Sequence, residues 1–339
     1  MRRLKQLNLF AIILFVFIGV SCERTKKFGK ESSIGKTNEI LVVTNNADQW
    51  DGAIGNAVKE TFGADIQTLP QAEPKYNLLH IGMSRFKDVY LKNRNILILR
   101  INRDISEPVV ESRRDVWNTP QIVVEIQAPT QTDLIRAFDE NQEGIQLLFS
   151  KNERTRILLT YKRLQEPDVV KAVEKHMGIK MLIPQGFYVA KEDTNFIWLR
   201  RVATAFNQEI IIYTQPYYSE KQLSPNYIIQ ERDSITKKYI PGEMEGSFMM
   251  TERRKNLIPP VSKNVKDFNN HYAVETRGLW KVFNDFMGGP FLNYTVIDEK
   301  HNRVVTIDGF VYAPNKNKRD YLKQLEAVMY SMEFIDMKK

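Results

Sequence analysis

The sequence of 339 residues contains a single cysteine, Cys22. A chain with one cysteine forms no internal disulfide, so packing and hydrogen bonding must stabilise its fold. The composition allows this, because 42% of the residues are hydrophobic. The length favours two domains over one. We therefore expect a globular protein with a hydrophobic core in each of two domains.

The position of Cys22 in the chain indicates how the protein is processed. An apolar run over residues 9–20 lies between a basic start and Ser21. As a helix at about 1.5 Å per residue, this run reaches roughly 18 Å, whereas a membrane core measures roughly 30 Å. A basic start, a short apolar region and small residues before a cut site are typical of a secretory signal. We predict that residues 1–21 are a signal peptide.

The same segment resembles the signal of bacterial lipoproteins, in which a peptidase cuts before a cysteine that carries diacylglycerol. Ser21 and Cys22 match this pattern, whereas Gly19 stands where the family prefers an aliphatic residue. Gly19 and Ser21 also fit ordinary secretory cleavage, so a secreted protein or an uncleaved anchor stay open as alternatives. The resemblance implies that Cys22 is the lipidation site. Several acyl chains of the palmitate type on Cys22 would hold the protein stably on a membrane.

Charge patterning argues against nucleic acid as a partner. Loss of Arg2, Arg3 and Lys5 with the signal lowers the formal charge from +8 to +5. The remaining basic residues are scattered among acidic ones, whereas nucleic-acid binders gather them into a stripe. We expect a solvated surface with mixed charges.

The pattern of apolar residues divides the mature chain into a tether and a first domain. Residues 22–38 are polar and predict a flexible tether. In residues 39–164, apolar runs typical of buried strands alternate with helical patterns. Strands are expected at 39–44, 77–81, 95–101 and 121–128, and helices at 48–62, 85–91 and 130–149. This alternation predicts a small α/β layer with one sheet.

Residues 165–339 show a different pattern, with many short strands and few helices. Strands are expected at 182–190, 195–201, 209–214, 248–252, 271–276, 279–285, 292–298 and 304–313, and helices at 167–177, 225–239 and 318–332. Several of the strands alternate apolar and polar residues, which is typical of antiparallel sheets. We predict an α+β domain in which helices cover an antiparallel sheet.

Several motifs resemble an uncharacterised lipoprotein family of Bacteroidota-type bacteria. They are NEILVV at 38–43, IPQGF at 183–187, WLR at 198–200, GLW at 278–280 and GGPF at 288–291. The resemblance spans most of the chain and implies location and architecture, because no activity is established for the family. The order of elements from residue 304 to residue 334 is similar to the PsbP-like fold of extrinsic photosystem proteins. That similarity implies a binding or assembly role by fold analogy alone.

A search for catalytic chemistry finds no constellation. The four histidines, His80, His176, His271 and His301, are dispersed and form no metal-ligand pair. A G-x-S-x-G elbow is absent, although a triad assembled from distant residues stays open. Residues 29–37 resemble a P-loop, but their spacing is one residue too long. We predict no catalytic residue, no metal site and no cofactor.

Two features suggest a surface for a ligand or a partner. The segment 284–291 combines two glycines and a proline with two flanking aromatic residues, a composition suited to a recognition loop. Tryptophans elsewhere in the domain are suited to line a groove, although sheet core is the more frequent location of such residues. A hairpin turn is the alternative for the glycine pair. The predicted surface comprises Trp198, Trp280, Phe286, Gly288, Gly289 and Pro290.

Together these features predict a non-enzymatic lipoprotein of the cell envelope. It would face the periplasm and bind a partner protein, a glycan or a small ligand. Glu23 differs from the aspartate that retains some lipoproteins at the inner membrane, which favours the outer membrane. The alternative is a periplasmic hydrolase acting on glycan or peptide. Its acids would come from Glu192, Asp193, Asp285 and Asp298, and it requires two of them in one cleft.

Overall fold

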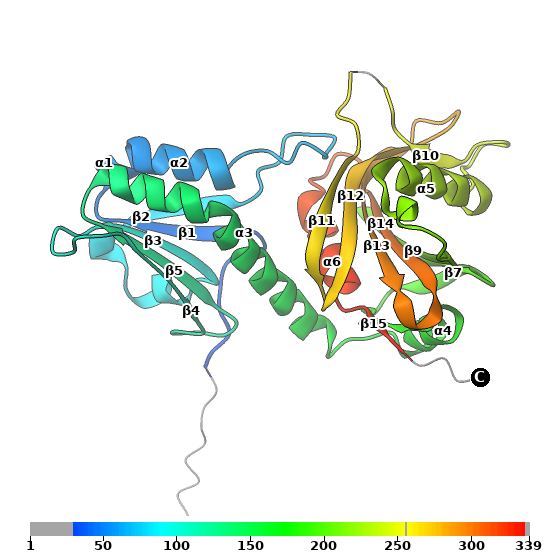
Figure 1. The fold of residues 1–339 in the computed structure, drawn as a ribbon, viewed down its shortest axis with the longest axis horizontal. Coiled ribbons are helices and arrows are strands. Elements are labelled where there is room, and N and C mark those ends of the chain that lie inside the picture. The colour runs from blue at the N-terminus through cyan, green and yellow to red at the C-terminus, as the bar shows by residue number, and fades with distance from the viewer. Residues whose placement is uncertain (1–29, 255, 336–339) are drawn as a thin grey trace, which may run out of the picture.

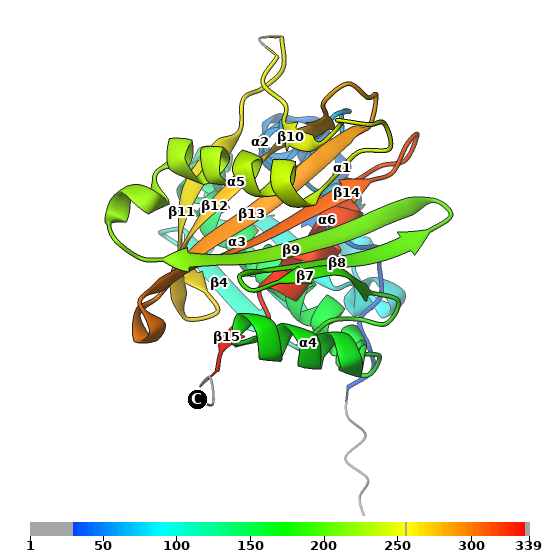
Figure 2. The ribbon, with the colours of Figure 1, turned by 90° about the vertical axis from the view of Figure 1, so that its right-hand side faces the viewer.

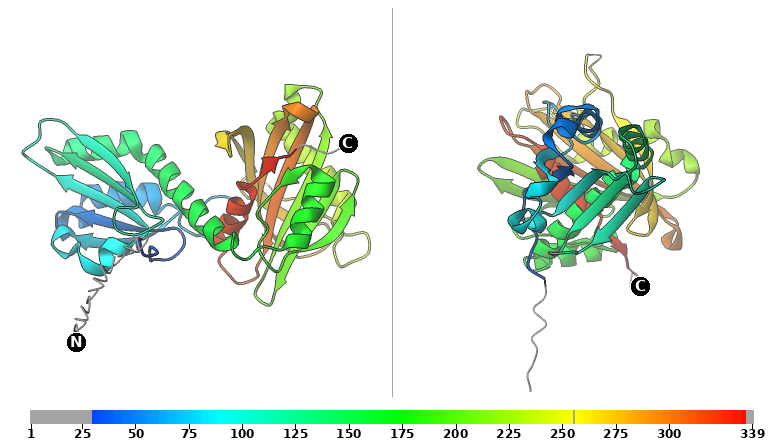
Figure 3. Two further views of the ribbon diagram at one scale, coloured as in Figure 1. Left: turned by 90° about the horizontal axis from the view of Figure 1, so that it is seen from below. Right: turned by 90° about the vertical axis from the view of Figure 1, so that its left-hand side faces the viewer.

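The structure is a computed structural model that describes residues 30–254 and 256–335. It consists of two domains joined by one long helix (Figures 1 and 3). The predicted signal peptide and Cys22 lie outside the described residues. Within the described residues, no helix is long and apolar enough to cross a membrane.

The first domain contains a five-stranded sheet with the strand order β2-β1-β3-β5-β4. The strands are β1 (Glu39–Thr44), β2 (Asn77–Gly82), β3 (Asn95–Ile101), β4 (Val109–Arg114) and β5 (Ile122–Ala128). All pair in parallel except β4, which runs antiparallel to β5 at the edge of the sheet. The α/β layer predicted for this domain is confirmed.

Helices cover one face of this sheet, and shorter turns cover the other. Helices α1 (Ala47–Asp51) and α2 (Ala53–Phe62) follow β1, and α3 (Gln131–Tyr161) follows β5. Phe62, Phe138 and Phe149 form the centre of the core on this face. The 3-10 helices η1 (Met83–Arg85) and η2 (Asp88–Lys92) lie on the opposite face, near Trp117.

Helix α3 continues well beyond residue 149, the last position of the inner face that the sequence pattern marked. Its 31 residues correspond to roughly 46 Å at about 1.5 Å per residue. The extension begins with a polar segment that is nevertheless buried, because Glu153 accepts bonds from Arg94 at 3.0 Å and Asn95 at 2.8 Å. The last turns of α3 then reach the second domain.

The described part of the predicted tether packs on the first domain. Ser33 is buried, and its Oγ donates to the carbonyl of Pro120 at 2.7 Å. The backbone N–H of Ile34 donates to the carbonyl of Lys92 at 2.9 Å. The flexible segment expected over residues 22–38 is therefore shorter at its C-terminal end, because these bonds hold residues 33 and 34 on the domain.

The second domain is built on an eight-stranded antiparallel sheet with the order β10-β12-β13-β14-β9-β8-β7, with β11 also paired to β12. The strands are β7 (Tyr188–Asp193), β8 (Phe196–Ala203), β9 (Phe206–Pro216), β10 (Met249–Thr251), β11 (Val261–Phe268), β12 (His271–Val282), β13 (Gly288–Asp298) and β14 (Arg303–Tyr312). A separate small pair joins β6 (Ile179–Lys180) to β15 (Glu333–Phe334).

Helices cover both faces of this sheet (Figure 2). Helices α4 (Pro167–Met177) and α6 (Arg319–Met329) pack on one face. Helix α5 (Pro225–Tyr239) packs on the other, and the 3-10 helices η3 (Glu220–Leu223) and η4 (Glu299–His301) lie in connecting loops. The predicted α+β architecture is confirmed. One uninterrupted strand, β12, replaces the two strands predicted between residues 271 and 285.

Candidate functional site

The connection between β12 and β13 presents one residue of the predicted surface fully to solvent. Phe286 lies at the tip of a tight hairpin with a relative exposure of 106%. Asn284 adopts a left-handed conformation at φ 61°, and Asp285 Oδ1 accepts the N–H of Phe286 at 2.6 Å. The hairpin is closed by a bond from Val282 N to Met287 O at 2.9 Å. Local hydrogen bonds therefore fix the loop that carries Phe286.

An aromatic stack supports the base of this hairpin. The Phe283 ring lies 5.2 Å from that of Phe248 with an interplanar angle of 22°. Lys237 Nζ lies 5.0 Å from the centre of the Phe248 ring. Phe283 itself remains exposed, so apolar surface extends from the tip of the hairpin to its base. An exposed apolar patch of this kind marks an interaction surface in many proteins.

Three other residues of the predicted surface do not lie in the loop. Gly288, Gly289 and Pro290 open strand β13, and Gly289 and Pro290 are buried. A Cβ on Gly289 would lie 2.1 Å from the carbonyl oxygen of Val311, so the close approach of β14 requires glycine there. The motif therefore serves the packing of the sheet rather than a flexible loop.

The two tryptophans are also part of the sheet. Trp280 is 3% exposed and contacts the core beneath α5. Trp198 is half-buried on β8, and its Nε1 donates to Glu209 Oε2 at 2.7 Å. Three strands separate β8 from β12, which amounts to roughly 19 Å between them at the usual strand spacing. Of the six predicted surface residues, Phe286 is the one that is fully exposed to solvent.

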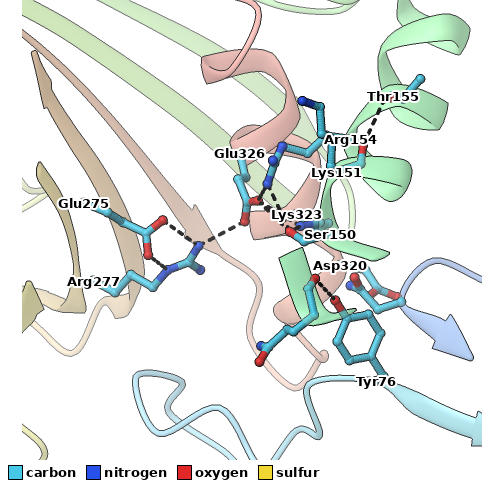
Figure 4. Close-up of polar contacts among 12 residues, drawn as sticks. Tyr76, Ser150, Lys151, Arg154, Thr155, Glu275, Arg277, Asp320, Lys323 and Glu326 are labelled. Carbon is cyan, nitrogen blue, oxygen red and sulfur yellow. Dashed lines mark hydrogen bonds and ion pairs between the residues drawn. The ribbon is translucent and has the colours of Figure 1, made fainter. Parts of the chain in front are cut away.

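A second concentration of functional groups lies where α3 meets the second domain, and sequence reasoning missed it (Figure 4). We call it the inter-domain cluster. It comprises Ser150 and Arg154 on α3, Lys323 and Glu326 on α6, and Glu275 and Arg277 on β12.

Glu326 is the centre of the inter-domain cluster. Its Oε1 accepts from Arg154 Nη1 and from Lys323 Nζ, each at 2.8 Å. Its Oε2 accepts from Arg277 Nη2 at 3.0 Å. Arg277 also donates through Nε to Glu275 Oε1 at 2.8 Å. One carboxylate thus joins cations from both domains.

The electrostatics of the cluster favour ionised carboxylates. Burial acts to raise the pKa of Glu326, but Lys323, Arg277 and Arg154 outweigh it and hold that pKa well below its ordinary value. Burial also acts to raise the pKa of Glu275, and Arg277 again reverses the direction, so this pKa is lowered too. Burial lowers the pKa of Lys323 despite the attraction of Glu326.

These pKa directions decide what the cluster can do chemically. A glycan hydrolase with a carboxylate pair needs one carboxyl group whose pKa is raised, so that it can protonate the leaving group. Glu275 and Glu326 share Arg277, but both have lowered pKa values and carry no proton at neutral pH. Their arrangement suits a structural link between domains.

Of the acids considered for a hydrolase, Glu192 and Asp193 are neighbours on β7, but their partners lie on helices that cover opposite faces of the sheet. Glu192 pairs with His176 at 3.1 Å, and Asp193 accepts from Tyr239 Oη at 2.6 Å. Asp285 and Asp298 flank opposite ends of β13, a separation of roughly 35 Å at about 3.3 Å per residue. Among the residues that the structure describes, no group of three or more His, Cys, Asp or Glu side chains could hold a metal ion.

Two family models match the chain, and both describe domains of unknown function. Residues 166–331 match Domain of unknown function (DUF4837). Residues 33–162 match Domain of unknown function (DUF8532). The matched regions correspond to the second and the first domain of the structure. Both halves of the chain therefore carry uncharacterised domains, as the sequence resemblance predicted. No curated protein matches the chain.

Three solved structures are distantly similar to parts of the chain. The Saccharomyces cerevisiae Ran-binding protein Mog1p is 9% identical with a TM-score of 0.31, over 47% of this chain and 91% of that chain. A mutant of protein Mog1 is 9% identical with a TM-score of 0.29, over 47% and 92%. A structure from Bacteroides thetaiotaomicron VPI-5482 is 10% identical with a TM-score of 0.27, over 48% and 47%. The α+β assignment therefore rests on the strand pairing itself.

Proposed function

We propose that this protein is a non-enzymatic binding module of the cell envelope, held on the outer membrane by an acylated Cys22 and facing the periplasm. The observation that carries the binding role is the exposure of Phe286 on a fixed hairpin. Aromatic side chains dominate the binding energy of many interfaces when they enter a pocket of the partner. A loop that is already ordered also loses little entropy on binding.

The orientation of the molecule supports a protein partner rather than the anchoring lipid. The described chain begins, in blue, at the bottom of the views in Figures 1 and 2, and the connection between β12 and β13, in orange, lies at the top. A protein tethered through Cys22 would therefore direct the Phe286 hairpin away from its own membrane. We infer that the partner is an envelope protein with an apolar pocket for a phenyl ring.

Substitution of Phe286 tests the binding role. The full chain, crosslinked in membranes and purified, would be compared with Phe286→Ala and with Leu147→Ala, which removes a 67% exposed side chain from α3. We expect recovery of the partner to fall at least about tenfold for Phe286→Ala, equivalent to about 1.4 kcal/mol. Leu147→Ala should leave it unchanged. If Phe286→Ala recovers as much partner as Leu147→Ala, the proposal is refuted.

The anchor is tested separately by metabolic labelling. Cells grown with labelled palmitate should incorporate the label into the wild-type chain and not into Cys22→Ala. The membrane fraction should lose the mutant protein, because a single acylated residue supplies the proposed attachment. Label that persists in Cys22→Ala would rule out the lipoprotein assignment and leave the role of Phe286 untouched.

A further inference from the structure

Strand β4 is an edge strand that the rest of the molecule leaves uncovered. It pairs with β5 in an unbroken antiparallel register from Val109↔Gln127 to Arg114↔Ile122. All six of its residues are exposed, Val109 and Val110 included. Within the described part of the chain, no strand pairs with its outer side. Such an edge offers free backbone donors and acceptors to another strand.

Strand β7, an antiparallel edge strand of the second sheet, is different. Its pairing with β8 contains a register shift between Val189 and Lys191. Irregularities of this kind bend an edge strand and protect it against further pairing. Strand β4 has no such irregularity, so its outer edge remains straight and available.

The charges on β4 are incompletely neutralised. Glu111 lies directly opposite Glu125 of β5, and like charges in this position destabilise a sheet. Arg113 Nη2 contacts Glu125 Oε2 at 2.8 Å, so the arginine neutralises Glu125. Glu111 forms no ion pair with any described residue. A cation placed beside Glu111 from the open side of β4 would reduce the repulsion between Glu111 and Glu125.

A second copy of β4 supplies that cation in one register only. When two identical antiparallel strands are related by a twofold axis, one residue lies opposite its own copy. An axis at Ser112 places Glu111 opposite Arg113 of the other copy, twice. An axis at Glu111 or Arg113 would instead place like charges opposite each other.

We propose that β4 pairs antiparallel with β4 of a second copy of this chain, centred on Ser112, so that the two five-stranded sheets become continuous. Pairing of one short strand buries less surface than a stable protein interface does, so we expect the dimer to be weak in solution. Attachment of both copies to one membrane would raise their effective concentration, and this step rests on the proposed anchor at Cys22.

The course of the chain agrees with pairing near a membrane. Lys30 Nζ donates to the carbonyls of Asp115 and Val116, which directly follow β4. The segment leading back to Cys22 therefore starts beside the C-terminal end of this strand. Anchoring at Cys22 would thus keep β4 of neighbouring molecules at a similar height above the membrane.

Disulfide trapping in membranes tests the register. Opposed residues of an antiparallel pair have Cα atoms about 4.5–5.5 Å apart, which is within the range of a disulfide. The full chain with Ser112→Cys, oxidised with diamide, should form a dimer at least about ten times faster than the chain with Glu107→Cys. Glu107 is exposed in the loop before β4 and serves as the control. The wild-type chain measures any background from Cys22.

Charge exchange tests whether the predicted charge pairs control the rate of disulfide formation at Ser112→Cys. In the Ser112→Cys background, Glu111→Arg alone and Arg113→Glu alone should each slow dimer formation at least about fivefold, because each places like charges opposite each other. Coexpression of these two variants with different tags should restore a mixed dimer, and the double variant should restore the homodimer. The same changes at Arg103 and Glu107 should have no effect.

The outcomes separate this proposal from the proposed function. Equal rates for Ser112→Cys and Glu107→Cys would overturn the pairing, as would single charge variants whose mixture fails to recover. Either result leaves palmitate labelling of Cys22 and the role of Phe286 unchanged. Recovery in the mixture also shows that each variant folds, since a misfolded chain would not dimerise with its complement.

Discussion

In two regions of this molecule a carboxylate is buried beside basic side chains, but the pKa of the carboxylate shifts in opposite directions. Beneath α5, Asp308 on β14 accepts from Arg232 Nε at 2.8 Å and Nη2 at 3.3 Å, and both side chains are fully buried. In the inter-domain cluster, Glu326 accepts from two arginines and a lysine. The pKa of Asp308 is raised, whereas that of Glu326 is lowered well below its ordinary value.

The balance of neighbouring charges accounts for the difference, because Asp308 faces one arginine and the carboxylate of Asp233, whereas Glu326 faces three cations. Burial raises the pKa of both groups, because an interior of low dielectric disfavours charge. One arginine does not offset this effect at Asp308, even with a further bond from Asn293 at 3.1 Å. Three cations do offset it at Glu326. The pair beneath α5 therefore tolerates a neutral partner, while the link between the domains depends on a full negative charge.

The largest effect is expected for Glu326→Gln. The amide keeps the shape of the side chain but leaves Arg154, Lys323 and Arg277 without the charge at their centre. Loss of one partner of a buried ion pair costs about 3–5 kcal/mol of unfolding free energy. Urea denaturation measures it, with Glu333→Gln as an exposed control. If Glu326→Gln lowers the unfolding free energy no more than Glu333→Gln does, the contrast between Glu326 and Asp308 is wrong.

Acidification should reproduce this loss in the wild-type protein. The folded-state pKa of Glu326 lies below its ordinary value of 4.5. Its contribution to stability is therefore complete above that value and is lost as the pH falls through the lower, folded-state pKa. Unfolding free energies measured between neutral and acidic pH should converge for the wild type and Glu326→Gln at the acidic end. A difference independent of pH would contradict the assignment of the charge to Glu326.

Removal of one of the three cations should have a smaller effect. Arg154 Nη1 binds Glu326, and its Cζ lies 3.7 Å from the centre of the Tyr330 ring. Arg154→Met keeps most of the apolar stem, while Lys323 and Arg277 remain on Glu326. We expect a loss of about 1.5–3 kcal/mol, the usual contribution of a hydrogen bond to a charged group. Arg163→Met, which removes an exposed cation after α3, is the control for thermal and urea denaturation.

The buried strands could be predicted from the sequence, because their environment leaves a simple pattern. Strands β1 and β3 lie inside the first sheet, and the continuous apolar runs at 39–44 and 95–101 match their observed bounds. Proline at the first position of α5 marked the start of that helix. In each case one physical requirement, burial on both faces or a fixed φ, acts on neighbouring residues.

Exposed strands left no comparable pattern. Strand β4 buries none of its residues, and β11 is largely exposed, so neither shows an apolar run or a clear alternation. These strands form because their backbones hydrogen-bond to a neighbouring strand, and their own residues contain no sign of that neighbour. The sequence analysis predicted neither strand. The C-terminal part of α3 was missed for a similar reason. Its buried residues include Asn152 and Glu153, which are polar and do not extend the apolar pattern.

The inter-domain cluster was invisible for a related reason. Arg154, Arg277 and Glu326 are far apart in the sequence, and each resembles a charged surface residue by itself. The local signals were short spacings within single elements, such as Lys323 and Glu326 on α6 and Glu275 and Arg277 on β12. The exposure of Phe286 follows from a local feature, a tight hairpin with glycine and asparagine nearby, whereas the burial of Trp280 and Gly289 depends on β14 and α5.

Asp308→Asn sharpens the comparison from the other side, with the smallest expected effect. The raised pKa of Asp308 means that the folded state accepts a neutral side chain at this position more readily than the unfolded chain does. Asparagine keeps an acceptor for Arg232, so we expect a loss below about 1.5 kcal/mol, similar to one hydrogen bond. Asp308→Ala removes both acceptors and should cost about 3–5 kcal/mol, because Arg232 is then buried without a partner. The difference between the wild type and Asp308→Asn should also shrink on acidification, since protonation makes the native side chain neutral too. If Asp308→Asn costs as much as Glu326→Gln in urea denaturation, the balance of neighbouring charges does not distinguish the two regions.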